Sequence, residues 1–212
     1  MGIENQEKEG FHPIYLLAAG YVAAVYLVVF LTFFISREDS LETGGGVWLF
    51  LLPIVLAAVN LLVVVIGRDR ISREQLLNCT VLIKYALIPM YIAGGIVVAA
   101  SLLLMLTPVV FMFFVGPAIA IAFSTFGWIV MVGGAPYSVA YIVKSRKQGV
   151  HGTVLSVFAG IFQFFFTVDV LSIIVLALKE KRWVKTTVAL LILLLLTVLA
   201  LVVCLVGLLT LG

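Results

Sequence analysis

The sequence predicts an all-α fold: a polytopic helical membrane protein with about six transmembrane helices in one bundle. Of the 212 residues, 64% are hydrophobic and only 11% are charged, against about 45–50% apolar and about 25% charged residues in soluble domains. Backbone groups in lipid must hydrogen-bond to one another, so only helices and closed barrels cross a bilayer. The apolar runs are near-continuous rather than alternating, which excludes a barrel. We therefore expect residues 1–212 to form a single helical membrane domain.

The first part of the chain predicts transmembrane helices at about residues 13–35 and 47–67. Each is long enough to cross ~30 Å of hydrocarbon at ~1.5 Å per residue. An acidic loop, residues 36–46, separates the two helices. Three basic residues follow the second helix: Arg68, Arg70 and Arg73. The positive-inside rule places these arginines, and with them the N-terminus, in the cytoplasm.

The central part predicts two further helices, at about residues 85–106 and 109–143, joined by an outer turn at Thr107-Pro108. The residue before proline avoids helical geometry, which favours a turn at this position. Proline and glycine pairs within both helices predict kinks or breaks. A second basic cluster then returns the chain to the cytoplasm: Lys144, Arg146 and Lys147.

The last part predicts helices at about residues 153–178 and 184–211. A complete fifth crossing would leave the basic residues between these helices outside, against the positive-inside rule. The alternative is five crossings plus a re-entrant segment at residues 153–178. With six crossings, both termini are cytoplasmic. Short basic loops and an acidic, uncleaved N-terminus favour a multi-pass protein of a cell membrane, such as a bacterial inner membrane.

Asp169 is the most informative residue, because it is the only charge between Thr153 and Leu178. An acid near the centre of a bilayer costs roughly 2.5–3.5 kcal/mol on insertion scales, and such residues generally mark functional sites. Lys84 is the candidate counter-ion if its helix begins near Leu76. If the helix begins nearer Tyr85, with residues 72–84 along the interface, Lys84 snorkels to the headgroups, and we favour this second arrangement.

Other polar groups could support Asp169. On one continuous helix, Ser156 and Gln163 share a stripe of small and polar residues, and Ser172 lies one turn after Asp169. A packing seam is favoured over a solute-lining face for that stripe, because small residues let helices approach closely. Asn60, in the second helix, is expected to form an interhelical hydrogen bond. The candidate ligand or ion site therefore comprises Asp169, Gln163, Ser156, Ser172, Lys84 and Asn60.

Motifs of enzyme chemistry are absent from the sequence. It contains no zinc-protease, serine-hydrolase, P-loop or dinucleotide-binding motif, so we predict no catalytic residue and no cofactor. The two histidines lack neighbours at metal-ligand spacing, so no metal site is expected. The basic residues lie in short connections and leave no extended basic surface, which argues against nucleic-acid binding.

Two functions are predicted, and an intramembrane enzyme stays open as a third. The first is binding or transport of a small solute or ion, with Asp169 as the key polar group. The second is a non-transporting accessory or scaffold protein that docks a partner membrane subunit, or another copy of itself, through small residues of the first helix, among them Ala19 and Ala23. In either case membrane lipid is an obligatory partner.

Overall fold

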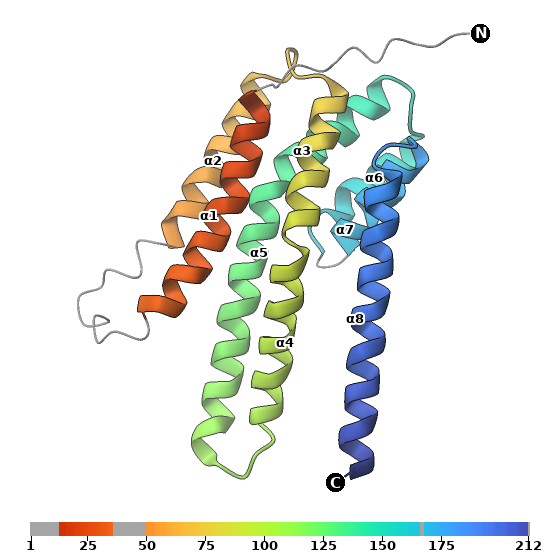
Figure 1. The fold of residues 1–212 in the computed structure, drawn as a ribbon. Helices are drawn as coiled ribbons and strands as arrows, with labels where there is room; N and C mark the ends of the chain where they lie inside the picture. The colour runs from red at the N-terminus through yellow and green to blue at the C-terminus, as the bar shows by residue number, and fades with distance from the viewer. Residues whose placement is uncertain (1–12, 36–49, 166–167, 212) are drawn as a thin grey trace. The chain divides into compact units, whose positions relative to one another are not determined.

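The computed structural model describes residues 13–35, 50–165 and 168–211, and these residues form α-helices and no strand (Figure 1). The all-helical prediction is therefore confirmed for this part of the chain. The helices are α1 (Pro13–Ile35), α2 (Leu51–Ile66), α3 (Arg73–Ala86), α4 (Ile88–Leu104), α5 (Val110–Lys147), α6 (Thr153–Phe162), α7 (Val168–Lys179) and α8 (Val184–Leu211).

The chain packs as two compact units, residues 1–170 and residues 171–212. The first unit holds α1 to α6 and the first turn of α7. The second holds the rest of α7 and α8. The expectation of one domain over residues 1–212 stays a prediction.

Helix α5 is the centre of the first unit. It packs against α2, α3, α4 and α6, whereas α1 packs against α2 and α3. Helices α3 and α4 follow one another along one side of α5, as Figure 1 shows. Most of α3 is buried, but α4 buries only Ile88 and Ser101. The first unit therefore encloses α3 and leaves α4 largely open to its surroundings.

The third predicted helix begins earlier than expected. The Ser72 hydroxyl accepts a hydrogen bond from the Gln75 backbone, and the Gln75 side chain accepts one from the Ser72 backbone. This capping box satisfies two N–H groups that would otherwise lack partners, so the helix starts at Arg73. Residues 73–86 are thus a buried helix, not an interfacial lead-in. The chain is interrupted at Leu87, because Pro89 has no N–H to continue the ladder.

Helix α5 continues through Pro117 and Pro136, so the breaks considered at these prolines do not occur. Its glycines instead permit close helix packing. A Cβ atom on Gly116 would collide with the Ser101 carbonyl oxygen of α4, and one on Gly133 would collide with the Tyr21 side chain of α1. These positions must therefore stay small for α5 to remain at the centre of the unit.

The predicted fifth helix, residues 153–178, is wrong as a continuous helix. The chain forms α6 and α7 instead, and three successive backbone bonds of the tight i to i−3 type end α6: Gln163 to Gly160, Phe164 to Ile161 and Phe165 to Phe162. Ser156 and Gln163, the two candidates of the inferred polar stripe, therefore belong to α6 and its C-cap, whereas Asp169 belongs to α7.

The boundaries of the other predicted helices agree more closely. The helices at 13–35 and 184–211 are found with the expected ends. Residues 47–49 lie outside the described part, and α2 ends at Ile66. Helix α5 extends to Lys147, four residues beyond the expected end at 143.

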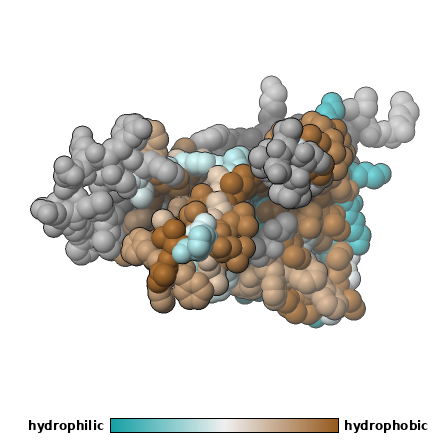
Figure 2. Space-filling view, turned by 90° about the horizontal axis from the view of Figure 1, so that it is seen from below, coloured by the Kyte–Doolittle hydropathy of each residue, from teal (hydrophilic) through white to brown (hydrophobic). Residues whose placement is uncertain are grey.

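Three helical stretches in the described part are long and apolar enough to cross a membrane: Pro13–Thr32, Arg73–Leu104 and Val110–Lys147. The second combines α3 and α4. Large apolar side chains are widely exposed, among them Leu106 (77%) and Val110 (78%) at the α4–α5 turn, and hydrophobic residues dominate the described surface in Figure 2. Exposure on this scale suits a lipid environment rather than water.

Candidate functional site

A buried ion pair joins α3 to the first turn of α7, inside the first unit. The Lys84 ammonium donates to Oδ2 of Asp169, and each side chain is only 1% exposed. Neither charged group contacts water, so the attraction between the two groups must compensate for the hydration that each has lost. Breaking such a pair leaves an uncompensated buried charge, which is strongly destabilising.

The position of Lys84 follows from the start of α3. Lys84 is eleven residues after Arg73, which places it about 16 Å along the helix at ~1.5 Å per residue. Seven other residues of α3 are buried with it. Lys84 is buried against Asp169 instead of extending to the surface, so the favoured snorkelling arrangement is wrong and the counter-ion arrangement is correct.

Asp169 lies where the chain resumes helical structure after α6. Its Oδ1 accepts the backbone N–H of Val170 at 2.7 Å, while Oδ2 faces Lys84. The first turn of a helix presents unpaired N–H groups and a partial positive charge, both of which favour a carboxylate. Asp169 is therefore compensated by the backbone on one side and by a cation on the other.

Tyr91 lies near Asp169, and two further tyrosines lie near Tyr91. Tyr91 of α4 is close enough to interact electrostatically with Asp169, Tyr21 and Tyr26. The Tyr26 hydroxyl donates to the Ala86 carbonyl at 2.6 Å, next to the interruption at Leu87, and the Tyr21 hydroxyl donates to the Val130 carbonyl at 2.8 Å. Our sequence analysis missed these tyrosines. The available signal was that a phenolic hydroxyl within an apolar segment needs a hydrogen-bond partner.

Two of the remaining candidates form hydrogen bonds close to their own positions in the chain. Ser156 and Gln163 donate to carbonyls one turn earlier in the chain, those of Gly152 and Ala159, each at 3.1 Å. Ser172 is half-buried and belongs to the second unit. A role of these three side chains in a ligand or ion site stays a prediction.

Asn60 makes the interhelical bond that its sequence position predicts. Its Oδ1 accepts the hydroxyl of Tyr137 at 3.0 Å, which links α2 to α5, and the Asn60 side chain is fully buried. Its Nδ2 has no hydrogen-bond partner among the described residues. Asn60 is a packing contact of the first unit rather than a ligand of the ion pair.

Within the described residues, no group of three or more His, Cys, Asp or Glu side chains could hold a metal ion. The candidate site is therefore one buried acid and one buried base, with Tyr91 near the acid. Paired ionisable residues within apolar segments are rare, and they commonly belong to ion or proton pathways.

No curated protein and no solved structure matches the sequence. A family profile, described as a family of unknown function (DUF6652), matches residues 13–182. This range covers both Lys84 and Asp169 and most of the chain. The chain thus belongs to the family of unknown function DUF6652.

Proposed function

We propose that this protein is a small integral membrane protein that binds or moves a small solute or ion, with the Lys84–Asp169 pair as its charged centre. The buried pair is the observation that carries the proposal. Ionisable residues inside membrane segments are rare, and they commonly mark ion or proton pathways.

The helix interruptions on both sides of the pair support this function. Lys84 lies three residues before the interruption at Leu87, and Asp169 follows the end of α6 at Phe162 by seven residues. In secondary transporters, interrupted helices expose backbone groups to the substrate near the middle of the membrane. A cation or proton that reached Asp169 would compete with Lys84 for the carboxylate. Re-formation of the Lys84–Asp169 pair would then release the bound ion.

The function predicts a large effect of Asp169→Asn on flux. The amide keeps the size of the side chain and removes its charge, so cation or proton movement through reconstituted vesicles should fall at least tenfold. Proton flux is measured with an enclosed pH-sensitive dye, and sodium and potassium flux with their own indicators. Asp69→Asn is the matched control, because Asp69 is exposed in the α2–α3 connection. Unchanged flux in a folded Asp169→Asn protein would refute the proposal.

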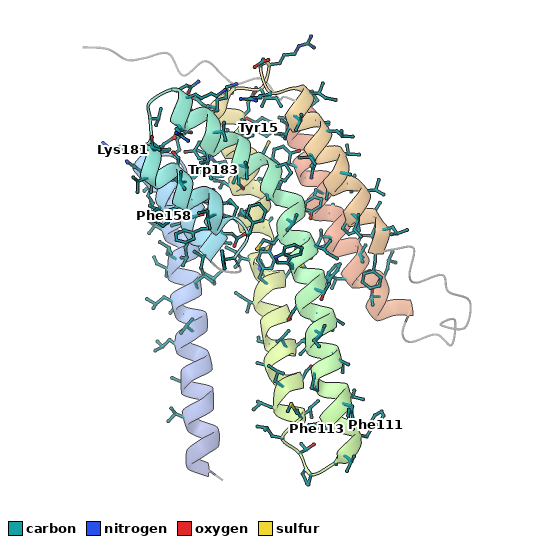
Figure 3. The ribbon with its side chains drawn as sticks, turned by 180° about the vertical axis from the view of Figure 1, so that it is seen from behind. Tyr15, Phe111, Phe113, Phe158, Lys181 and Trp183 are labelled. Carbon is teal, nitrogen blue, oxygen red and sulfur yellow. The ribbon has the colours of Figure 1, made fainter. Side chains whose placement is uncertain are left out.

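We further propose a multi-pass topology with the N-terminus in the cytoplasm. The Lys144 ammonium donates to the backbone carbonyls of Arg68 and Ile71, so the two basic connections meet at one end of the first unit. Figure 3 shows Tyr15 at one end of this unit and Phe111 and Phe113 at the other. The basic end is the cytoplasmic end by the positive-inside rule.

The lengths of α6 and α7 favour the re-entrant arrangement over six full crossings. Helix α6 has 10 residues and α7 has 12, which correspond to about 15 Å and 18 Å. Neither alone crosses ~30 Å of hydrocarbon. If they form a re-entrant pair, the basic residues that precede α8 also lie in the cytoplasm, and the C-terminus lies outside.

Cysteine labelling tests this topology. In a protein with Cys79 and Cys204 replaced by alanine, an impermeant maleimide should modify Arg70→Cys, Arg146→Cys and Lys185→Cys from the cytoplasmic side. Thr107→Cys should react only from the other side. Labelling of Lys185→Cys together with Thr107→Cys would instead support six crossings and a cytoplasmic C-terminus.

A scaffold function is the second candidate, and one observation favours it. Ala19, Gly20 and Ala23 are exposed on α1, and a Cβ atom on Gly20 would meet nothing within 4 Å. Such a surface could receive a helix of a partner subunit. A stoichiometric partner that co-purifies in mild detergent and is lost on Ala23→Leu, with flux absent throughout, would favour the scaffold.

A further inference from the structure

A long groove runs between α2 and α5 on the first unit. Its volume is about 810 Å³, within the ~300–1,000 Å³ typical of ligand pockets. Apolar side chains line most of its length: Ile54, Leu61 and Val65 from α2, and Trp128, Val132 and Ala140 from α5. Neither Lys84 nor Asp169 lines it, so the groove is separate from the ion pair.

Charged residues line only one end of the groove. Arg68, Lys144 and Lys147 lie there together with Asp69, which leaves a net charge of +2. Lys144 is held in place, because its ammonium donates to the carbonyls of Arg68 (3.2 Å) and Ile71. Arg68 and Lys147 are exposed. The groove is therefore amphipathic along its axis, with an apolar trough and a basic mouth.

We propose that this groove binds one anionic phospholipid, with an acyl chain in the trough and the phosphate at the basic mouth. From Ile54 to Arg68 the trough follows α2 for fourteen residues, or about 21 Å. This length spans one leaflet of a ~30 Å hydrocarbon core and reaches its headgroup region. The mouth lies at the end of the unit that carries both basic connections, where anionic headgroups would be attracted.

The distribution of charge along the groove indicates which molecule binds there. A free phosphate would leave the apolar trough unfilled, and a zwitterionic lipid would bring no net negative charge to the mouth. An anionic phospholipid satisfies both parts of the groove. Each Lys or Arg near an anionic lipid surface contributes about 1 kcal/mol, which corresponds to roughly fivefold in affinity. The lipid site goes beyond the proposed function and does not depend on it.

Native mass spectrometry of the full chain in mild detergent tests the proposal. Dioleoyl phosphatidylglycerol should bind at least tenfold more tightly than dioleoyl phosphatidylcholine. Arg68→Gln and Lys147→Gln should each weaken phosphatidylglycerol binding by roughly fivefold. Ala140→Phe, which fills the trough, should weaken binding of both lipids and so separates the acyl-chain contribution from the headgroup contribution.

Arg70→Gln is the matched control, since Arg70 is an exposed base in the same connection that does not line the groove. It should change phosphatidylglycerol binding by less than twofold. Equal binding of the two lipids by the unsubstituted protein would overturn the proposal. So would an effect of Arg70→Gln as large as that of Arg68→Gln, or full lipid binding by Ala140→Phe.

Discussion

Replacing Lys84 by methionine is expected to destabilise the protein by about 3–5 kcal/mol, because it leaves the carboxylate of Asp169 buried without its cation. Both side chains are 1% exposed, so water cannot take the place of the ammonium. The apparent Tm of the purified protein in mild detergent should fall by roughly 10 °C. Lys147→Met is the matched control, because Lys147 is exposed and its loss should change Tm by little.

A double substitution distinguishes the stability of the pair from its function. In Lys84→Met with Asp169→Leu, no charge remains buried, and such replacements are often neutral or stabilising. The double variant should therefore regain most of the lost Tm while flux stays absent. Tm values for Lys84→Met and Lys147→Met that differ by less than 2 °C would contradict the buried pair. Full flux in the stable double variant would contradict its functional role.

Gly116→Ala is expected to separate α4 from α5 and to destabilise the protein by about 1–3 kcal/mol, the usual cost of overpacking. The added Cβ would collide with the Ser101 carbonyl oxygen and lie 3.3 Å from the Met105 nitrogen. Both are backbone atoms, so relief requires one helix to move. Thermal unfolding in detergent measures the loss.

Gly94→Ala makes the same chemical change as Gly116→Ala, but we expect no loss of stability. A Cβ atom on Gly94 meets nothing within 4 Å. Alanine is favoured over glycine in a helix by up to about 1 kcal/mol, so this variant should be as stable as the parent or more stable. If both substitutions shifted Tm in the same direction by the same amount, the close approach of α4 and α5 at Gly116 would be disproved.

The ion pair and the groove require different helix packing within the first unit. The pair requires an enclosed α3, which α1 and α5 cover. The groove requires that α2 and α5 diverge enough to leave a trough beside that core. Helix α5 contributes to both, and its glycines allow close contact with α1, α3 and α4 on its packed faces. Substitutions at the packed glycines of α5 should therefore affect both features, whereas Arg68 and the exposed Lys147 affect the groove alone.

The candidate site was predicted only in part from sequence. Asp169 and its possible partner Lys84 could be named, because a charge within an apolar run is visible without a structure. We favoured snorkelling over pairing from the sequence, and this choice was wrong, because it depends on where α3 begins. That start is set by the local Ser72–Gln75 capping box, which our sequence analysis overlooked. The tyrosines were missed because the approach of Tyr91 to Asp169, and of Tyr21 and Tyr26 to Tyr91, depends on tertiary packing.

By itself, the sequence determined the helical class, the apolar character of the surface, and the ends of the helices at 13–35 and 184–211. These properties follow from local composition and from the length of apolar runs. Only the tertiary structure decided that 153–178 is interrupted and that Lys84 meets a carboxylate 85 residues away. Pairing of residues so far apart in sequence depends on which helix faces pack together. Hydropathy along the chain does not show which faces do so.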